Sequence, residues 1–171
     1  KVPTQWKTSK TVLVLLFKKG DLHDVGNYRP ICLLSVVYKL FTRVILNRID
    51  TTLDECQPCE QAGFRKGFST MDHIHTMSRV IEVSRKYKRT LCLTFNDFQK
   101  AFVSNEIEAV MEALDNQGVP TLYIKILREL YKNFRTKISP FYNDVNVDVK
   151  KGVRQGDTIS SKLFTATLQN V

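Results

Sequence analysis

The sequence predicts an α+β fold in which helices pack on one face of an antiparallel sheet. Two short apolar runs, residues 12–17 and 91–95, have the length of strands. Valines that alternate with polar residues between positions 145 and 150 indicate a third strand with one buried face. Apolar residues that recur every three or four positions predict several helices. The chain has 171 residues, of which 43% are hydrophobic, so it is long enough to bury a core.

The chain is expected to begin with two neighbouring extended segments. Residues 12–17 are followed by Lys-Lys-Gly-Asp, which is typical of a turn after a strand. A second strand or extended arm is expected to begin near Asn27, because Pro30 holds the preceding Arg29 away from helical angles. The start of the chain is therefore predicted to be a strand, a turn and a second extended segment.

Two amphipathic helices are predicted next. Residues 35–49 show helical spacing, with Ser35 as the candidate cap. Residues 61–67 break this pattern with two glycines, and Ser69 followed by Asp72 forms a capping box that opens the second helix. The apolar positions predicted to face the core are Val36, Val37, Leu40, Phe41, Val44, Ile45 and Ile49 in the first helix and Ile74, Met77, Val80 and Ile81 in the second.

The rest of the chain is predicted to contain two more helices and a strand pair. After the strand at residues 91–95, Ser104 caps a helix that ends at Gly118. The alternating strand is expected to pair with residues 135–141 across a turn near Asn143. The helix between them carries its apolar residues on one face, at Tyr123, Ile126, Leu127, Leu130 and Phe134.

The chain is strongly basic, with 26 lysines and arginines against 17 acidic residues and a formal net charge of +9. Such a charge favours an anionic partner, because neutralising phosphates releases their counterions. A nucleic acid is one such partner, and a solvated basic surface is the alternative.

No segment of the sequence predicts a membrane span or a secretion signal. The longest apolar stretch near the start ends at Lys18, well short of the about 18 apolar residues that a span needs. The first ten residues are polar, and no small-residue cleavage site follows the first apolar run. The chain does not begin with methionine, so we expect a fragment. Because no secretion signal is present, we expect an intracellular protein, and no targeting signal decides between nucleus and cytoplasm.

The four cysteines are Cys32, Cys56, Cys59 and Cys92, and only Cys56 and Cys59 form a C-x-x-C pair. A zinc site takes four ligands, and no second pair follows at finger or ribbon spacing. We expect reduced cysteines that serve as small apolar residues, with a zinc site as the alternative.

One carboxylate stands where a metal ligand is expected. Asp97 follows the apolar run at residues 91–95, so a strand end would present its side chain rigidly. Mg²⁺ prefers oxygen ligands, and the carbonyl of Phe98 could supply another. In a nucleotidyl transfer, two such ions about 4 Å apart would activate the attacking hydroxyl and stabilise the leaving pyrophosphate. The alternative is an ordinary acidic residue, because strands commonly end where the chain turns polar.

Four segments carry a family resemblance. They are N-Y-R-P-I-C-L-L-S-V-V-Y-K-L-F-T-R-V-I-L-N-R-I (27–49), Q-A-G-F-R-K-G-F-S-T (61–70), F-N-D-F-Q-K-A-F (95–102) and G-V-R-Q-G-D-T-I-S-S-K-L-F (152–164). In this order they resemble the reverse transcriptases of non-LTR retrotransposons. The resemblance implies RNA-directed DNA synthesis by two-metal nucleotidyl transfer, with Mg²⁺, dNTP, an RNA template and a DNA primer. It also implies a fingers subdomain over residues 1–90 and a partial palm over residues 91–171.

The resemblance implies that the triphosphate and sugar of the nucleotide contact residues from both the fingers and the palm. Lys18 or Lys19, together with Arg29, would bind the triphosphate through a point charge and a bidentate fork. Asp97 would be the first metal-binding acid, and Phe102 would exclude a 2′-hydroxyl and so select deoxynucleotides. The alternatives are exposed lysines before a turn, an arginine at a proline boundary and a phenylalanine that is plain core.

The last motif and the glycine-flanked loop supply the other expected contacts. Gln155 and Gly156 would lie under the base and sugar of the nucleotide, where glycine permits a close backbone approach. Arg154 would steer template or primer phosphates, and Arg65 with Lys66 would face template or phosphate. A glycine-rich turn capped by serine would explain the glycines of the last motif but not its Arg-Gln pair, and Arg65 could equally be an ordinary loop residue.

The sequence also departs from the family pattern. Val103 stands where a polar or acidic residue is usual, and Ser161 replaces a proline. No Ala-Asp-Asp sequence, which completes the metal site in the family, occurs in the chain. We therefore expect no polymerase activity from these residues alone. The alternatives are a non-catalytic nucleic-acid-binding relic and a decayed sequence whose product does not fold stably.

Overall fold

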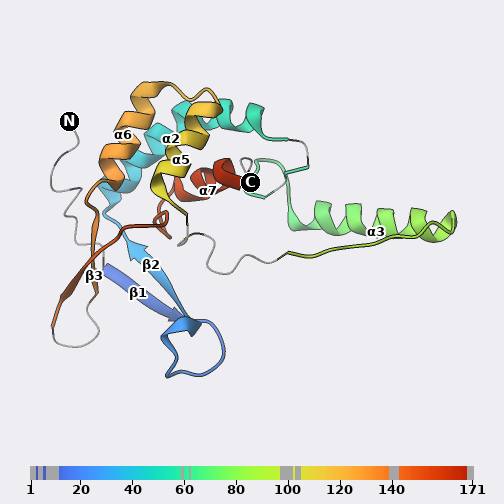
Figure 1. Cartoon of the computed structure of the whole chain (residues 1–171), viewed down its shortest axis with the longest axis horizontal. Coiled ribbons are helices and arrows are strands. Elements are labelled where there is room, and N and C mark those ends of the chain that lie inside the picture. Colours follow the sequence, from blue (N-terminus) through green and yellow to red (C-terminus); the bar gives the residue numbers. More distant parts are fainter. Residues whose placement is uncertain are drawn as a thin grey trace. The chain divides into compact units, whose positions relative to one another are not determined.

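A computed structural model describes residues 3, 6, 12–58, 60–61, 63–96, 102, 105–138 and 143–168. The chain divides into two compact units (Figure 1): Lys1–Gln57 together with Lys100–Val171, and Pro58–Gln99. The first unit holds a four-stranded sheet and most of the described helices. The predicted combination of helices and strands in one fold is confirmed. The packing of the helices on one face of the sheet and the division into fingers and palm at residue 90 stay predictions.

The first unit opens with an antiparallel hairpin of strands β1 (Val12–Phe17) and β2 (Tyr28–Leu33). The connection carries one 3-10 turn, η1 (Val25–Asn27). The backbone N–H of Lys18 donates to the carbonyl of Asn27 at 2.9 Å and extends the pairing by one step. Both extended segments therefore lie where the sequence predicted them.

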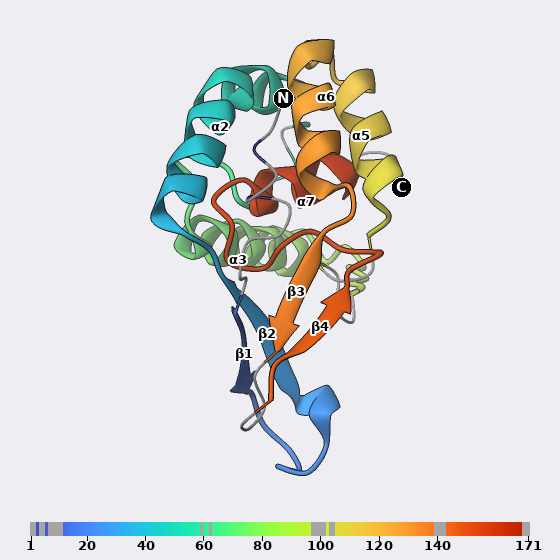
Figure 2. The same ribbon diagram turned by 90° about the vertical axis from the view of Figure 1, so that its left-hand side faces the viewer.

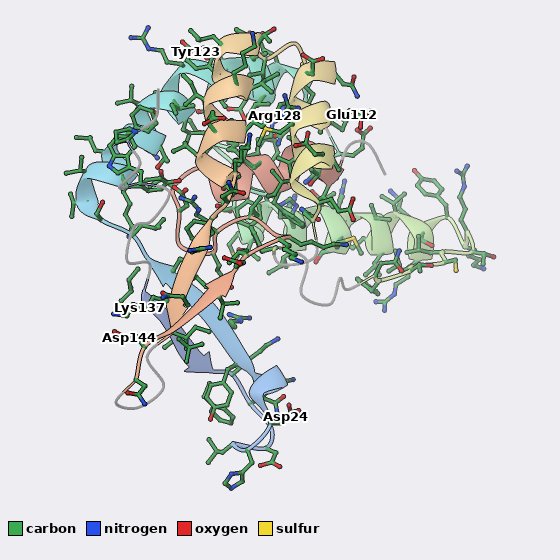
Figure 3. The ribbon with its side chains drawn as sticks, turned by 60° about the vertical axis from the view of Figure 1, so that its left-hand side comes forward. Asp24, Glu112, Tyr123, Arg128, Lys137 and Asp144 are labelled. Atoms are coloured by element: carbon green, nitrogen blue, oxygen red, sulfur yellow. The ribbon has the colours of Figure 1, made fainter. Side chains whose placement is uncertain are left out.

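A second antiparallel hairpin, β3 (Arg135–Ile138) and β4 (Val145–Asp148), is also confirmed. Strand β3 runs parallel to β1, with Val12 opposite Lys137, so the sheet order is β2-β1-β3-β4. Figure 2 shows the four strands below the helices α2, α5 and α6. The antiparallel prediction holds within each hairpin and fails where the hairpins meet, because β1 and β3 are joined by a long connection that permits parallel pairing. Lys137 forms an ion pair with Asp144 (Figure 3).

Strand β4 is exposed along its whole length. The alternation of Val145 and Val147 with polar residues predicted one buried face, but both valines are exposed. The prediction of a half-buried strand is therefore wrong, because no described element covers either face of β4.

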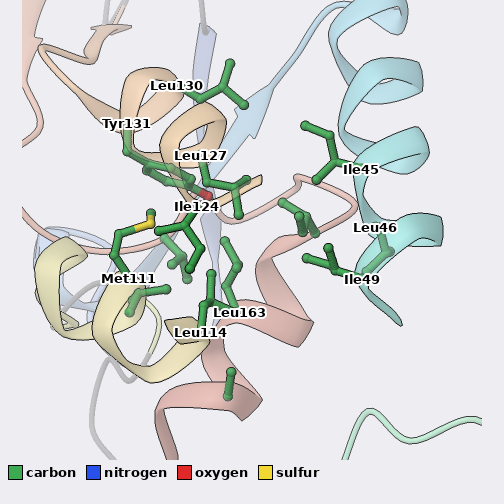
Figure 4. Close-up of a cluster of buried hydrophobic side chains, with 14 of the residues drawn as sticks. Ile45, Leu46, Ile49, Met111, Leu114, Ile124, Leu127, Leu130, Tyr131 and Leu163 are labelled. Atoms are coloured by element: carbon green, nitrogen blue, oxygen red, sulfur yellow. The ribbon is translucent and has the colours of Figure 1, made fainter. Parts of the chain in front are cut away.

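The core of the first unit lies among helices α2 (Val36–Cys56), α5 (Ile107–Asn116), α6 (Thr121–Tyr131) and α7 (Ser160–Leu168). Figure 4 shows side chains from all four helices meeting in one cluster. Burial of one such aliphatic side chain stabilises the fold by about 1.5–3 kcal/mol. The most deeply buried apolar side chains include Ile49, Leu53, Met111, Leu114, Leu127, Leu130, Ile159 and Leu163.

Helix α2 begins where the sequence predicted but buries a different face. Ser35 Oγ accepts a hydrogen bond from the backbone N–H of Tyr38 at 3.2 Å, as expected of an N-cap. Apolar residues cover much of the circumference of this helix, so periodicity alone did not identify the packed face. The predicted core positions Val36, Val37, Leu40 and Val44 are exposed. The buried residues are Tyr38, Thr42, Ile45, Leu46, Ile49 and Leu53.

Helices α5 and α6 confirm two of the predicted helices. Helix α5 begins at Ile107 after Glu106, and the predicted cap Ser104 lies outside the described residues. Gly118 has a φ of +74°, and this left-handed conformation ends the helix as predicted. Helix α6 packs the predicted face, with Leu127 and Leu130 fully buried. Among the described helices, none combines the length and the apolar composition that a membrane span requires.

The second unit contains helix α3 (Thr70–Lys86), which begins with the predicted capping box. Ser69 donates from its backbone N–H and from Oγ to the carboxylate of Asp72, at 2.7 and 2.8 Å. These bonds lower the pKa of Asp72, because they favour the ionised carboxylate. The start of α3 is therefore fixed by local hydrogen bonds.

The second unit departs from the sequence predictions in two ways. No side chain of helix α3 is buried, and Ile74 and Val80 are exposed although they were predicted to face a core. The strand predicted at residues 91–95 is wrong, because the structure assigns no strand there. A strand requires a neighbour for its backbone groups, and no described segment pairs with these residues.

Candidate functional site

The motif at residues 152–164 folds into a turn that leads into helix α7. The backbone N–H of Asp157 donates to the carbonyl of Arg154 at 3.2 Å, and this bond closes the turn of residues 154–157, which we call the 154–157 turn. Gly156 has a φ of +106°, a conformation that favours glycine. A Cβ atom on Gly156 would lie 2.7 Å from the carbonyl oxygen of Cys32. A larger residue would therefore push the turn away from strand β2.

The 154–157 turn is hydrogen-bonded to strand β2. The backbone N–H of Cys32 donates to the carbonyl of Gln155 at 2.8 Å. Cys32 follows Arg29 by three residues, about 10 Å along a strand. Gln155 is partly exposed and Gly156 is exposed. The fold therefore places two predicted nucleotide contacts beside the strand that carries a third, although they lie far apart in the sequence.

Arg154 is buried, with 3% of its surface exposed. Its Nη2 donates to the carbonyl of Leu130 at 2.6 Å. Its guanidinium lies over three aromatic rings, 3.8 Å from the centroid of Phe134, 4.9 Å from Tyr38 and 5.0 Å from Tyr131. Cation–π contacts of this kind are stronger when water is excluded. This burial counts against the predicted contact between Arg154 and nucleic-acid phosphates and favours a role inside the protein.

Asp157 is also buried, at the other end of the turn. Its carboxylate accepts hydrogen bonds from the hydroxyl of Tyr38 at 3.1 Å and from Oγ1 of Thr42 at 2.8 Å. Tyr38 and Thr42 lie one turn apart on α2, so both hydroxyls reach the same carboxylate. Helix α2 therefore holds the C-terminal end of the 154–157 turn.

Burial shifts the pKa of three groups around the turn by disfavouring their charged forms. It raises the pKa of Tyr131 to about 12, and the Asp157 carboxylate adds to the effect. Burial also raises the pKa of Tyr38 far above its ordinary value. It raises the pKa of the Cys32 thiol as well, and the Arg154 charge opposes both shifts. Tyr38 therefore stays protonated at neutral pH and remains a donor to Asp157.

Sequence reasoning missed Tyr38, Thr42 and Asp157. The available signal was the pair of hydroxyl side chains at positions 38 and 42, four residues apart within an otherwise apolar helix. Such a pair on the buried face needs a polar partner. The sequence did not indicate that the partner, Asp157, would come from the far end of the chain.

The β1–β2 hairpin brings together the three cations predicted to bind triphosphate. Lys18 and Lys19 directly follow β1, and Arg29 is the second residue of β2. All three are exposed. In the strand register, Arg29 lies opposite Leu16, two residues before Lys18. The predicted cations therefore lie near one end of one hairpin, where an anion could reach them.

Phe102 is partly buried and packs in the core of the first unit. Its ring centroid lies 4.6 Å from that of Phe164, with an interplanar angle of 30°. Its carbonyl accepts a hydrogen bond from the backbone N–H of Val153 at 2.8 Å, just before the 154–157 turn. These contacts favour the core alternative, and the role of Phe102 in excluding a 2′-hydroxyl stays a prediction.

Arg65 and Lys66 lie in the second unit. Arg65 is partly buried and donates from Nη1 to the carbonyl of Pro58 at 3.2 Å. Its guanidinium also lies 5.3 Å from the ring centroid of Phe68. Lys66 is exposed. The contacts of Arg65 suit an ordinary loop residue, and binding of nucleic acid by either side chain stays a prediction.

The predicted metal ligands Asp97 and Phe98 lie outside the described residues. Within the described ranges, no group of three or more His, Cys, Asp or Glu side chains could hold a metal ion. Of the C-x-x-C pair, Cys56 donates from Sγ to the carbonyl of Gln117 at 3.3 Å, and Cys59 lies outside the described residues. The magnesium and zinc hypotheses therefore stay untested.

Comparison with known proteins gives a match to one family. Residues 17–171 match the family described as "Reverse transcriptase (RNA-dependent DNA polymerase)". The match includes the 154–157 turn, strand β2 and residue 97. It therefore covers every segment that the sequence motifs singled out.

Individual relatives come from transposable elements. The chain is 26% identical to a "Retrovirus-related Pol polyprotein from type-1 retrotransposable element R2" of Popillia japonica, over 99% of the chain and 24% of that protein. It is 28% identical to a "Probable RNA-directed DNA polymerase from transposon BS" of Drosophila melanogaster, over 95% of the chain and 18% of that protein. A "Putative 115 kDa protein in type-1 retrotransposable element R1DM" of the same species is 30% identical, over 99% and 16%. The chain thus spans less than a quarter of the length of these curated relatives.

Proposed function

The chain belongs to the reverse transcriptase family, and from this membership we propose that it forms part of the nucleotide-binding and template-primer-binding surface of a retrotransposon RNA-directed DNA polymerase. In this proposal the chain is a piece of a longer enzyme. Its ligands are dNTP, an RNA template and a DNA primer.

One observation carries the proposal most directly. The hydrogen bond between Cys32 and Gln155 joins strand β2 to the 154–157 turn. Arg29, Gln155 and Gly156 all belong to the first unit of the protein. A triphosphate bound by Arg29 would therefore have its base and sugar within reach of a turn whose position relative to β2 is fixed.

Charge supports the same assignment. Lys18, Lys19 and Arg29 are exposed at the hairpin, where they could bind the triphosphate oxygens. Arginine offers a planar pair of donors, and lysine offers a compact charge that tolerates several phosphate positions. Gln155 is neutral and can hydrogen-bond to a base or sugar without adding charge.

The donor types at positions 97 and 98 fit Mg²⁺. Asp97 offers a carboxylate and Phe98 a backbone carbonyl, and Mg²⁺ binds oxygen ligands of this kind. When bound, the ion would supply charge stabilisation for nucleotidyl transfer. The sequence contains no Ala-Asp-Asp segment that could add further carboxylates. We therefore expect these 171 residues alone to bind ligands but not to extend a primer.

Nucleotide binding by the chain tests the proposal. We expect Arg29→Ala to raise the Kd for dNTP about tenfold, the loss of one charge-assisted contact. Arg48→Ala removes an exposed arginine from α2 without a predicted ligand contact and should leave the Kd unchanged. Calorimetric titration measures both values. Equal affinity in the wild type and Arg29→Ala would contradict the proposed triphosphate contact.

The net charge of +9 favours a second candidate, a nucleic-acid-binding protein without chemistry. It predicts that the logarithm of RNA affinity falls linearly with the logarithm of salt concentration. It also predicts that Asp97→Ala leaves both RNA binding and any function of the longer protein unchanged. Under the polymerase proposal, Asp97→Ala in a longer enzyme that contains this chain abolishes primer extension.

A further inference from the structure

The 154–157 turn ends in a buried positive charge on one side and a buried negative charge on the other. Arg154 donates a hydrogen bond to Leu130 of α6. Asp157 accepts hydrogen bonds from Tyr38 and Thr42 of α2. We propose that Arg154 and Asp157 are positioning residues that fix Gln155 and Gly156 against strand β2, and so set the geometry of the nucleotide site. This inference rests on the proposed function for the identity of the ligand.

The contacts of Arg154 suit positioning better than binding of an outside ligand. One nitrogen, Nη2, donates to the carbonyl of Leu130, and the guanidinium plane lies against aromatic rings. Its Nε and Nη1 are buried, and neither has a hydrogen-bond partner in the described part of the chain. A buried charge with unused donors is costly for stability. Stability alone therefore does not account for an arginine at this position, whereas control over the turn does.

The contacts of Asp157 fix the other end through two neutral donors. Tyr38 and Thr42 both reach its carboxylate from α2, and both are fully buried. Two donors from one helix define the direction of the carboxylate, so the end of the turn has little freedom to rotate. The carboxylate and the Arg154 charge also attract each other across the turn.

Between these ends, the turn has almost no room to slide along β2. The carbonyl of Gln155 is bonded to the backbone N–H of Cys32, and Gly156 approaches the Cys32 carbonyl too closely for a Cβ atom. A small movement of Arg154 or Asp157 would break this fit. The distance between Gln155 and Arg29, and with it the span available to a nucleotide, therefore depends on residues that touch no nucleotide.

Tyr38→Phe is the most selective test of this inference. It keeps the ring beside Arg154 and removes the hydroxyl that donates to Asp157. The backbone N–H groups of Cys32 and Asp157 both bond within the site and report its order by hydrogen exchange. We expect exchange at these two amides to rise about tenfold, as for the loss of one hydrogen bond to a charged group. Amides in the middle of α6 should keep their protection.

Tyr28→Phe is the matched control. It also removes a tyrosine hydroxyl that donates a hydrogen bond, in this case to the carbonyl of Leu22 at 2.8 Å, and it leaves the turn untouched. Exchange at Cys32 and Asp157 should not change in this variant. Asp157→Asn supplies a second test, because it keeps the shape of the side chain, removes its charge and leaves one acceptor oxygen for the two hydroxyls of Tyr38 and Thr42. It should raise exchange at the same two amides.

A dNTP titration of the same variants completes the experiment. The inference predicts a Kd about tenfold higher in Tyr38→Phe and unchanged melting of the remainder of the first unit. Unchanged exchange at Cys32 and Asp157 in both Tyr38→Phe and Asp157→Asn would overturn it, as would faster exchange with unchanged dNTP affinity. A wild-type chain that binds no dNTP would overturn the proposed function instead, and the exchange data would still decide whether the charged pair fixes the turn.

Discussion

The two units of the chain support their helices by different means. In the first unit, α2, α5, α6 and α7 bury long apolar side chains against one another. In the second unit, no side chain of α3 is buried. Its interactions are local, and they include the capping box of Ser69 and Asp72 and an ion pair between Arg79 and Glu82 at 3.3 Å.

This difference shows that helix formation and helix burial depend on different information. Local signals such as a capping box predict where a helix begins, and they did so for both α2 and α3. Burial depends on partners that the helix meets only in the folded chain. Because most helical stability in proteins comes from packing, we expect α3 to open more readily than α2.

The largest expected effect is loss of a core side chain from the first unit. Leu127 is fully buried on α6, and Leu127→Ala should lower the free energy of unfolding by about 2–5 kcal/mol. The matched change in the second unit is Ile74→Ala, on the exposed side of α3, which should cost no more than about 0.5 kcal/mol. Urea unfolding followed by circular dichroism measures both values. Equal losses would contradict the contrast between the units.

A smaller effect is expected from the ion-pair group between α2 and α7. Lys162 Nζ lies 3.2 Å from Asp50 and also pairs with Asp54, and the lysine side chain is 10% exposed. Lys162→Met should destabilise the first unit by about 2 kcal/mol, because it leaves two partly buried carboxylates without their cation. Unfolding in denaturant measures the change. Adding Asp54→Ala to Lys162→Met should recover part of the loss, and no recovery would show that the carboxylates do not depend on the lysine.

The smallest effect is expected at the start of α3. The pKa of Asp72 in the folded chain lies below its ordinary value. The ionised carboxylate therefore stabilises the start of α3 fully at any pH above the ordinary aspartate pKa, about 3.9. This stabilisation is lost as the pH falls through the lowered pKa. The first turn of α3 should therefore lose helicity in acid before the core of the first unit unfolds. Backbone chemical shifts of residues 70–74 measure this. Asp72→Asn should remove the pH dependence of these shifts. Wild-type shifts that do not change in acid would contradict the role of the capping box.

Much of the backbone of the first unit could be predicted from the sequence. The strand at residues 12–17, the cap at Ser35 and the helix end at Gly118 all depend on neighbours within a few positions. The strand at residues 91–95 was predicted from the same kind of local pattern and is wrong. A strand needs a partner as well as an apolar sequence, and the local sequence contains no information about that partner.

The sequence predicted the exposed residues of the candidate site but not the buried residues that hold them. The sequence identified Gln155 and Gly156, and the structure places them beside the strand of Arg29. It did not identify Arg154 as a buried residue, because the aromatic rings around it come from α2 and from the end of α6. An arginine in a turn is usually exposed, so only the folded structure could indicate otherwise.

In the proposed function, the β1–β2 hairpin and the 154–157 turn form one nucleotide site. Titration of the isotope-labelled chain with dNTP, followed by amide chemical shifts, tests it most directly. We expect the amide signals of Arg29, Gln155 and Gly156 to shift together and to saturate at one Kd. Shifts confined to α3, or different saturation at Arg29 and at the turn, would contradict a single site.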